Sequence, residues 1–293
     1  MATPEPSEVD PITGQTTTGH EWDGIRELNT PLPRWWLWTF YASIAFAVVY
    51  WVLYPAWPLV TSFTHGVLGY TNRGQVAEDV KAIQAQRAVT EAGLDKASVV
   101  DIEADKKLLG LALAHGKAAF AEDCAPCHGS GGQGSKGYRN LTNEDWLWGG
   151  TLADIQTTIT HGIRAPNDPD TRSSVMPAFG KDGILKPDEI RQVASYVRTL
   201  SKFEPEAGVD VAAGKKLFGD NCAPCHGDDG KGNTSMGSAN LTDGLQLYGA
   251  DLKDLIQTIS YARNSTMPAW SARLDPVTIK ALTVFVHSLG AGQ

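Results

Sequence analysis

Cysteine and histidine occur together in one short motif that is present twice in the chain. Cys-Ala-Pro-Cys-His spans residues 124–128 and again residues 222–226, and the two copies contain all four cysteines. Cys-x-x-Cys-His is the attachment signature of c-type haem, in which each thiol adds to a porphyrin vinyl group and the histidine binds the iron. The motif therefore predicts two covalently attached haem c groups. Their attachment and iron-binding residues are Cys124, Cys127, His128, Cys222, Cys225 and His226.

Zinc binding, a redox-active dithiol and structural disulfides are the alternatives for two Cys-x-x-Cys pairs. Zinc ribbons usually separate the pairs by about 15–20 residues, far less than the interval from Cys127 to Cys222. A thioredoxin-like pair follows an apolar strand, and no such pattern precedes either motif. Disulfides would leave the two repeated histidines unexplained. Haem is therefore the favoured interpretation, with zinc and disulfides as the alternatives.

Methionine is the expected second ligand of each iron. Beyond the initiator the sequence has three methionines, and two of them, Met176 and Met267, begin matching Met-Pro-Ala-aromatic segments. A neutral, soft thioether favours ferrous iron and raises the reduction potential. Core packing is the alternative role for both. Met236 lies in a Gly/Ser-rich loop without a counterpart and is expected to be an ordinary loop residue, whereas His161 is expected near a haem edge.

The haem motifs lie inside a longer internal repeat. Gly116 corresponds to Gly214, and the Asn-Leu-Thr segment at 140–142 corresponds to 240–242. The pattern of each copy predicts a helix leading into the motif, then a Gly-rich loop, a middle helix, a methionine loop and a closing helix. Residues 190–200, in the closing helix of the first copy, carry an apolar stripe at helical spacing. So small a domain buries little core by itself, so the haem is expected to complete that core.

An uncharged segment precedes the repeats. Residues 35–54 contain no charged side chain, carry Trp and Tyr at both ends, and reach ~30 Å at helical rise, the thickness of a bilayer core. A cleaved signal peptide and a buried core helix are the alternatives, but the first 34 residues are acidic and Pro/Thr-rich rather than basic. Arg26 and Arg34 precede the segment, and the first base after it is Arg73. This distribution favours a cytoplasmic N-terminus. Covalent haem attachment in bacteria takes place on the outer side of the inner membrane, which independently predicts an inner-membrane protein with periplasmic haem domains.

Length and charge limit the remaining possibilities. A chain of 293 residues allows two domains and additional segments, and a net charge of −8 argues against nucleic acid as a partner. The expected fold is all-α, with one N-terminal transmembrane helix followed by two tandem class I cytochrome c domains. The connector is expected to contain a helix over residues 75–91 that ends before Gly93. The expected boundaries are 1–34 for the cytoplasmic segment, 35–57 for the transmembrane helix, 58–106 for the connector, and 107–203 and 207–293 for the two domains.

The residues around the uncharged segment indicate which family of cytochromes the chain resembles. Before and after the single span stand Asp23-Gly24-Ile25, Glu27, Asn29, Pro31, Leu32, Pro33, Trp35-Trp36, Tyr54-Pro55 and Trp57-Pro58. With two cytochrome c domains following, the chain resembles the membrane-anchored dihaem subunit (subunit III, or P subunit) of the cbb3-type cytochrome c oxidases. The resemblance covers about residues 20 to 290. Some relatives carry a second span near the N-terminus, whereas this sequence shows one.

The resemblance implies an electron-transfer subunit that contributes no catalytic residue of its own. It implies electrons arriving from a donor cytochrome c and leaving to the monohaem subunit, then to the haem–copper catalytic subunit that reduces oxygen and pumps protons. By the same resemblance His128 and His226 are proximal ligands, and Met176 and Met267 are distal ligands assigned crosswise, each binding the haem of the other domain. Sequence spacing alone fits either a crossed or an uncrossed assignment.

Two other functions are compatible with parts of the sequence. A free-standing, membrane-tethered dihaem electron carrier fits the haem motifs equally well. Small residues along the span favour packing against another membrane helix; they are Ala42, Ser43, Ala45 and Ala47. A dihaem peroxidase needs one iron with an open position, whereas the two matched methionines predict that both irons are closed.

Overall fold

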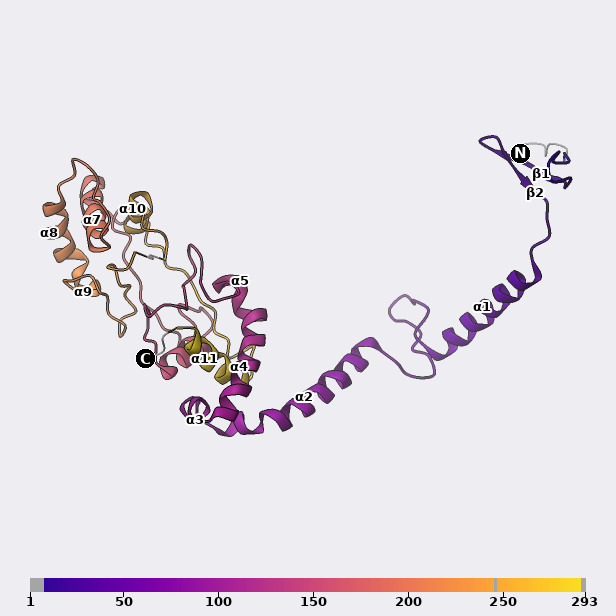
Figure 1. The fold of residues 1–293 in the computed structure, drawn as a ribbon, viewed down its shortest axis with the longest axis horizontal. Coiled ribbons are helices and arrows are strands. Elements are labelled where there is room, and N and C mark those ends of the chain that lie inside the picture. Colours follow the sequence, from indigo (N-terminus) through magenta and orange to yellow (C-terminus); the bar gives the residue numbers. More distant parts are fainter. Residues whose placement is uncertain (1–7, 245–246, 291–293) are drawn as a thin grey trace. The chain divides into compact units, whose positions relative to one another are not determined.

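Helices dominate the chain (Figure 1). The structure is a computed structural model that describes residues 8–244 and 247–290. The chain divides into two units, Met1–Gln86 and Arg87–Gln293, and both haem motifs belong to the second. The expected all-α class is confirmed. Residues 1–7 of the expected N-terminal segment lie outside the described residues.

A small β-hairpin opens the first unit. Strand β1 (Thr17–Trp22) pairs antiparallel with β2 (Ile25–Leu28) around Asp23 and Gly24. Both turn residues have positive φ, 49° and 84°, which is the type I′ geometry that follows the twist of the two strands. Sequence reasoning missed this hairpin, although Asp-Gly is a strong signal for such a turn.

Helix α1 (Arg34–Leu53) is the apolar helix of the first unit. It has 20 residues, and none of them is buried against the rest of the protein. At 1.5 Å per residue it spans ~30 Å, which matches a bilayer core. It ends inside the expected range 35–57 because Tyr54, which precedes Pro55, is extended, with φ −117° and ψ 162°.

Helix α2 (Asn72–Lys96) is longer than expected. The prediction that it ends before Gly93 is wrong, because the helix continues through this glycine. A Cβ atom at Gly93 would lie 2.7 Å from a methyl carbon of Leu108. The glycine therefore allows a neighbouring segment to approach closely instead of ending the helix. Leu94, the next residue, is buried in the second unit.

The second unit contains the two repeats, and each runs in the expected order. A helix leads into the haem motif and is followed by a middle helix and a closing helix. The first repeat comprises α3 (Val99–Ala104), α4 (Lys106–Ala119), the π-helical turn η1 (Phe120–Cys124), α5 (Ala125–His128), α6 (Leu152–His161) and α7 (Pro187–Leu200). The second comprises α8 (Val211–Asn221), α9 (Ala223–His226), α10 (Leu252–Tyr261) and α11 (Pro276–Leu289).

The closing helices are exchanged between the repeats. Helix α4 of the first repeat packs on α11 of the second, and α8 of the second packs on α7 of the first (Figure 1). Each crossing occurs at a glycine. A Cβ at Gly116 in α4 would lie 2.3 Å from the Ala281 carbonyl oxygen, and one at Gly214 in α8 would lie 2.1 Å from that of Gln192. The repeated glycines therefore let the backbones of two helices touch.

The hydrophobic core follows the exchanged pairs. One cluster joins Phe179, Ile190, Val193 and Val197 of the first repeat to Phe218, Leu255 and Ile259 of the second. Another joins Phe120, Ile155 and Ile159 of the first repeat to Ile279, Leu282 and Val286 of the second. The predicted apolar stripe of α7 is confirmed, since Ile190, Val193, Ala194 and Val197 are buried and Leu200 is partly buried. The expected ranges 107–203 and 207–293 stay a prediction, and each packed half of this unit contains residues of both repeats.

Substitution of the crossing glycines tests this packing. Gly116→Ala and Gly214→Ala should each lower the free energy of unfolding by about 1–3 kcal/mol, because the added methyl group meets a backbone carbonyl. Gly110→Ala and Gly219→Ala, in the same helices but with open space around the Cβ position, are matched controls. They should be neutral or stabilising by about 0.5–1 kcal/mol. Denaturant unfolding of the haem-loaded protein followed by circular dichroism measures the difference, and equal effects at all four positions would contradict the exchanged crossing.

Candidate haem sites

The two motif histidines have the same environment. The ring Nδ1 of His128 lies 2.8 Å from the Arg139 carbonyl oxygen, and that of His226 lies 2.8 Å from the Ala239 carbonyl oxygen. A proton on Nδ1 donated to the carbonyl leaves Nε2 free to bind a metal. Burial lowers the pKa of both imidazoles, against the opposing effect of the hydrogen bond. Both rings are therefore held neutral and oriented, as an iron ligand must be.

The four cysteines form no disulfide with one another, and they differ in exposure. Cys127 and Cys225 are exposed, Cys124 is half-buried and Cys222 is buried. Burial, with the nearby Asp123 charge, raises the pKa of Cys124 to about 12, and burial raises that of Cys222 to about 11. Redox-active Cys-x-x-Cys pairs instead have a lowered thiol pKa. The environment thus argues against the dithiol alternative.

A first cleft lies beside His128. It encloses about 700 Å³ of space not filled by protein atoms, including space that is open to solvent. Residues of the first repeat line most of it, including Phe120, Cys124, His128, Trp146, Trp148, Ile155 and Ile159. The remaining wall comes from the second repeat, with Met267, Trp270 and Val286. The structure therefore brings the methionine of the second repeat to the histidine of the first.

A second cleft lies beside His226 and shows the reciprocal arrangement. It encloses about 1250 Å³, again counting space that is open to solvent. Its lining from the second repeat includes Phe218, Cys222, Cys225, His226, Leu255 and Ile259. Its lining from the first repeat includes Met176, Pro177, Phe179, Val193 and Val197. All eight candidate residues except Cys127, which is exposed, therefore line one cleft or the other.

The two clefts adjoin each other. Arg139 and Leu147 line both of them. Arg139 also supplies the carbonyl that holds His128, and its guanidinium forms an ion pair with Asp145 at 2.6 Å. A shared wall of single side chains means that cofactors in the two clefts would be close neighbours.

Two buried donors in the first cleft fit a group that carries carboxylates. Nε of Arg139 and Nε1 of Trp148 are buried and have no hydrogen-bond partner among the described residues. A buried polar group without a partner is costly, so each donor calls for an acceptor. The apolar cleft, the free imidazole nitrogen, the paired thiols and these donors together match haem c, whose propionates are acceptors.

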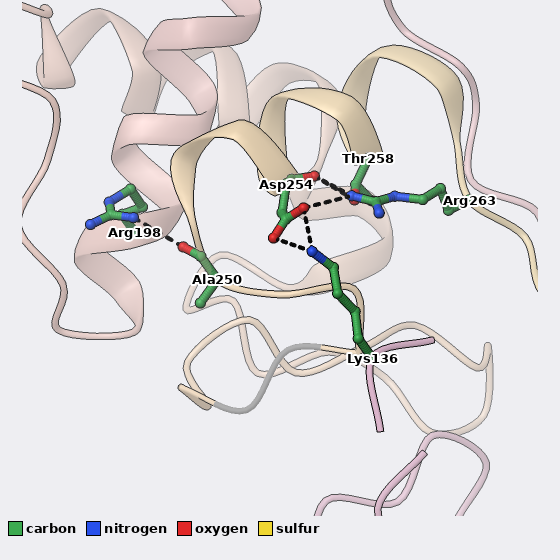
Figure 2. A network of polar contacts seen from close by, with 6 residues as sticks. All are labelled: Lys136, Arg198, Ala250, Asp254, Thr258 and Arg263. Carbon is green, nitrogen blue, oxygen red and sulfur yellow. Dashed lines mark hydrogen bonds and ion pairs between the residues drawn. The ribbon is translucent and has the colours of Figure 1, made fainter. Parts of the chain in front are cut away.

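An arginine, a carboxylate and an aromatic ring recur near each methionine loop. Arg172 lies over the ring of Trp148 and bonds Asp154 at 3.0 Å, and Arg263 lies over Tyr248 and near Asp254. Lys136, from the loop after the first haem motif, also bonds Asp254, at 2.6 Å (Figure 2). This last ion pair joins the two repeats directly.

The other candidates named from sequence lie elsewhere. Nδ1 of His161 lies 3.2 Å from both carboxylate oxygens of Asp168, and His161 lines neither cleft. Met236 is 43% exposed and also lines neither. Sequence reasoning missed Arg139 and Arg172. The signal for Arg172 was present, because Arg172 and Arg263 each stand four residues before a matched methionine.

Comparison with known protein families agrees with this architecture. Residues 14–61 match the N-terminal domain of cytochrome oxidase-cbb3, FixP; residues 113–201 match cytochrome c; and residues 209–286 match subunit III of cbb3-type cytochrome c oxidase. Fold, clefts and anchor helix thus define a membrane-anchored protein with two cytochrome c domains, which bind haem c.

Curated relatives align along nearly the full length. The cbb3-type cytochrome c oxidase subunit FixP of Bradyrhizobium diazoefficiens is 55% identical over 98% of this chain and 99% of that protein. Subunit CcoP of Azospirillum brasilense is 49% identical over 98% of this chain and 99% of its own length. Subunit CcoP of Cereibacter sphaeroides is 46% identical over 94% of this chain and 95% of its own length. This chain belongs to the FixP/CcoP family of cbb3-type oxidase subunits, and its cytochrome c domains give it an electron-transfer role. The resemblance proposed from sequence is confirmed.

Truncation tests whether the first cleft depends on the second repeat. A chain ending at residue 203 keeps the first haem motif but loses α11 and Met267. We expect it to be readily proteolysed and to lack the far-red absorption band of methionine bound to ferric haem, because α4 and α7 both lose the helix that covers them. Co-expression of residues 204–293 should restore both properties. A stable shorter chain with a full band would show that the first repeat folds alone.

Proposed function

We propose that this chain carries two haem c groups and relays electrons within a cbb3-type oxidase. Bound haem iron supplies reversible one-electron chemistry, and the protein supplies ligands, burial and orientation. Cys124 and Cys127 attach one group, and Cys222 and Cys225 attach the other. His128 and His226 are the proximal ligands.

The distal methionines are proposed to be crossed. Met267 would bind the iron at His128, and Met176 the iron at His226. The single observation that carries this assignment is the lining of the clefts, in which each histidine is joined by the methionine of the other repeat. A neutral imidazole opposite a neutral thioether favours the reduced state and raises the reduction potential.

The lining of the clefts also favours electron transfer over catalysis. A peroxidase needs an iron with an open position, and here each cleft contains both a histidine and a methionine. The shared lining by Arg139 and Leu147 supports rapid transfer between the two groups, because it brings them close. A histidine and a methionine that are both held by packed helices and loops would also limit structural rearrangement when the iron is oxidised or reduced.

Partners and orientation are proposed from family membership and charge. Electrons would arrive from a donor cytochrome c and leave through the monohaem subunit to the haem–copper catalytic subunit. Arg34 begins α1, and Arg26 precedes it, so the N-terminus would be cytoplasmic and the haem domains periplasmic. Alignment with oxidase subunits over nearly the whole chain favours this function over a free-standing carrier.

Methionine substitution tests the crossed ligands. Met267→Ala should lower the reduction potential of the haem attached at Cys124, on the order of 0.1 V, because loss of the thioether removes the ligand that favours ferrous iron. Met176→Ala should do the same to the haem attached at Cys222. Redox titration followed by NMR measures each potential, with contacts to Trp146 identifying the first haem and contacts to Phe179 the second. A drop at the haem of the same repeat would refute the crossing, and Met236→Ala should leave both potentials unchanged.

Gentle purification tests the place in the oxidase. Membranes extracted in mild detergent, with a tag on this chain, should yield haem b, copper and oxygen consumption in constant ratio to haem c. Membranes with the untagged chain, carried through the same steps, are the control for non-specific recovery. Recovery of haem c alone under conditions that keep the oxidase active would instead identify a free-standing carrier.

A further inference from the structure

Arg164 lies where the two methionine loops meet. Its Nη1 donates a hydrogen bond to the Ser174 carbonyl oxygen at 2.7 Å. Its Nε and Nη2 donate to the Ser265 carbonyl oxygen at 2.8 and 2.5 Å. Ser174 precedes Met176 by two residues, and Ser265 precedes Met267 by two residues. One guanidinium therefore holds the same backbone position in both loops.

Neighbouring backbone contacts reinforce this junction. The Ile163 N–H donates to the Met267 carbonyl at 3.0 Å, and the Met267 N–H donates to the Ile163 carbonyl at 2.9 Å. On the other loop, the Met176 N–H donates to the side-chain oxygen of Asn264 at 3.4 Å. The segment at residues 163–164 thus contacts both loops through the Ile163 backbone and the Arg164 side chain, which donates to a carbonyl of each loop. Asn264 of the Met267 loop adds a direct bond to the Met176 loop.

The backbone and charge of Arg164 fit such a role. Its φ is 53°, a conformation that side-chain-bearing residues adopt rarely and keep where the surroundings fix it. Burial lowers the pKa of its guanidinium, which nevertheless stays charged because arginine titrates far above neutrality. Hydrogen bonds from a charged donor are stronger than neutral ones. The side chain also lines the second cleft.

We propose that Arg164 is a positioning residue that holds both methionine loops, so that one side chain sets sulfur ligation at both irons. The proposal rests on the crossed ligation described under the proposed function. Its consequence is coupling between the two sites. When the contact is lost, both methionines become easier to displace, even though Arg164 belongs to only one repeat.

Four variants of the full-length, haem-loaded chain separate this role from general stabilisation. Arg164→Met removes the donors, and Arg164→Lys keeps a charge but loses the planar fork that reaches two carbonyls. Arg198→Met is the matched control, because Arg198 also donates to backbone carbonyls, including that of Ala250, yet lines neither cleft (Figure 2). Asn264→Ala removes the hydrogen bond by which the Met267 loop holds the Met176 N–H, and it leaves both Arg164 contacts in place.

Cyanide binding to the ferric protein reports how readily each methionine leaves its iron. Arg164→Met should speed binding about tenfold at both irons, the equivalent of about 1.4 kcal/mol in the opening of each iron–sulfur bond. It should also weaken the far-red band of methionine-bound ferric haem. Arg164→Lys should give a smaller change at both irons, Asn264→Ala should give a smaller change than Arg164→Met, and Arg198→Met should give the wild-type rates.

Each outcome decides one question. Absence of the far-red band from the wild-type chain would overturn the methionine ligation, and with it the proposed function. A wild-type band together with unchanged rates in Arg164→Met, or a change at one iron only, would overturn the role of Arg164 while leaving the ligation intact. If Arg164→Met retains no haem, Arg164→Lys is used in its place. Faster cyanide binding at both irons would support the role of Arg164, and faster binding at one iron or at neither would overturn it.

Discussion

Neither repeat of this chain closes its own haem cleft, and this exchange is the constraint on which the rest of the structure depends. Helix α4 is covered by α11 and α8 by α7, with both crossings made at a glycine where backbones meet. A domain of this size buries little apolar surface alone. Each repeat therefore gains most of its core from the other, and the two form one packed unit.

The exchange also decides the chemistry of the clefts. Both histidines are oriented by a carbonyl that follows the Gly-rich loop of their own repeat, whereas the methionine in each cleft comes from the other. The position of each histidine therefore depends on its own repeat, and the methionine beside it depends on how the two repeats pack. Arg164 and the Lys136–Asp254 ion pair lie where the repeats meet.

An electron-transfer role follows from features that a catalytic haem site lacks. The clefts are apolar, adjoin through Arg139 and Leu147, and contain a candidate ligand for both faces of each iron. Two parts of the chain match oxidase-specific families, the N-terminal segment with the hairpin and the apolar helix α1, and the second cytochrome c domain. The haem domains thus supply the redox function, and α1 anchors the chain to the membrane.

The sequence by itself determined the haem chemistry, the anchor and the order of helices, because each depends on local features: motif spacing, an uncharged run and helical periodicity. It also named Met176 and Met267, since their contexts match. It did not determine which methionine accompanies which histidine, why Gly93 lies inside a helix, or that Arg164 joins both loops. Most of those facts depend on contacts between residues a hundred or more positions apart, such as Arg164 with Ser265 or Gly116 with Ala281. Such pairings form when the apolar faces of helices pack together. Because the two repeats are similar, each helix could pack on the equivalent helix of either repeat. Only the tertiary structure decides between them.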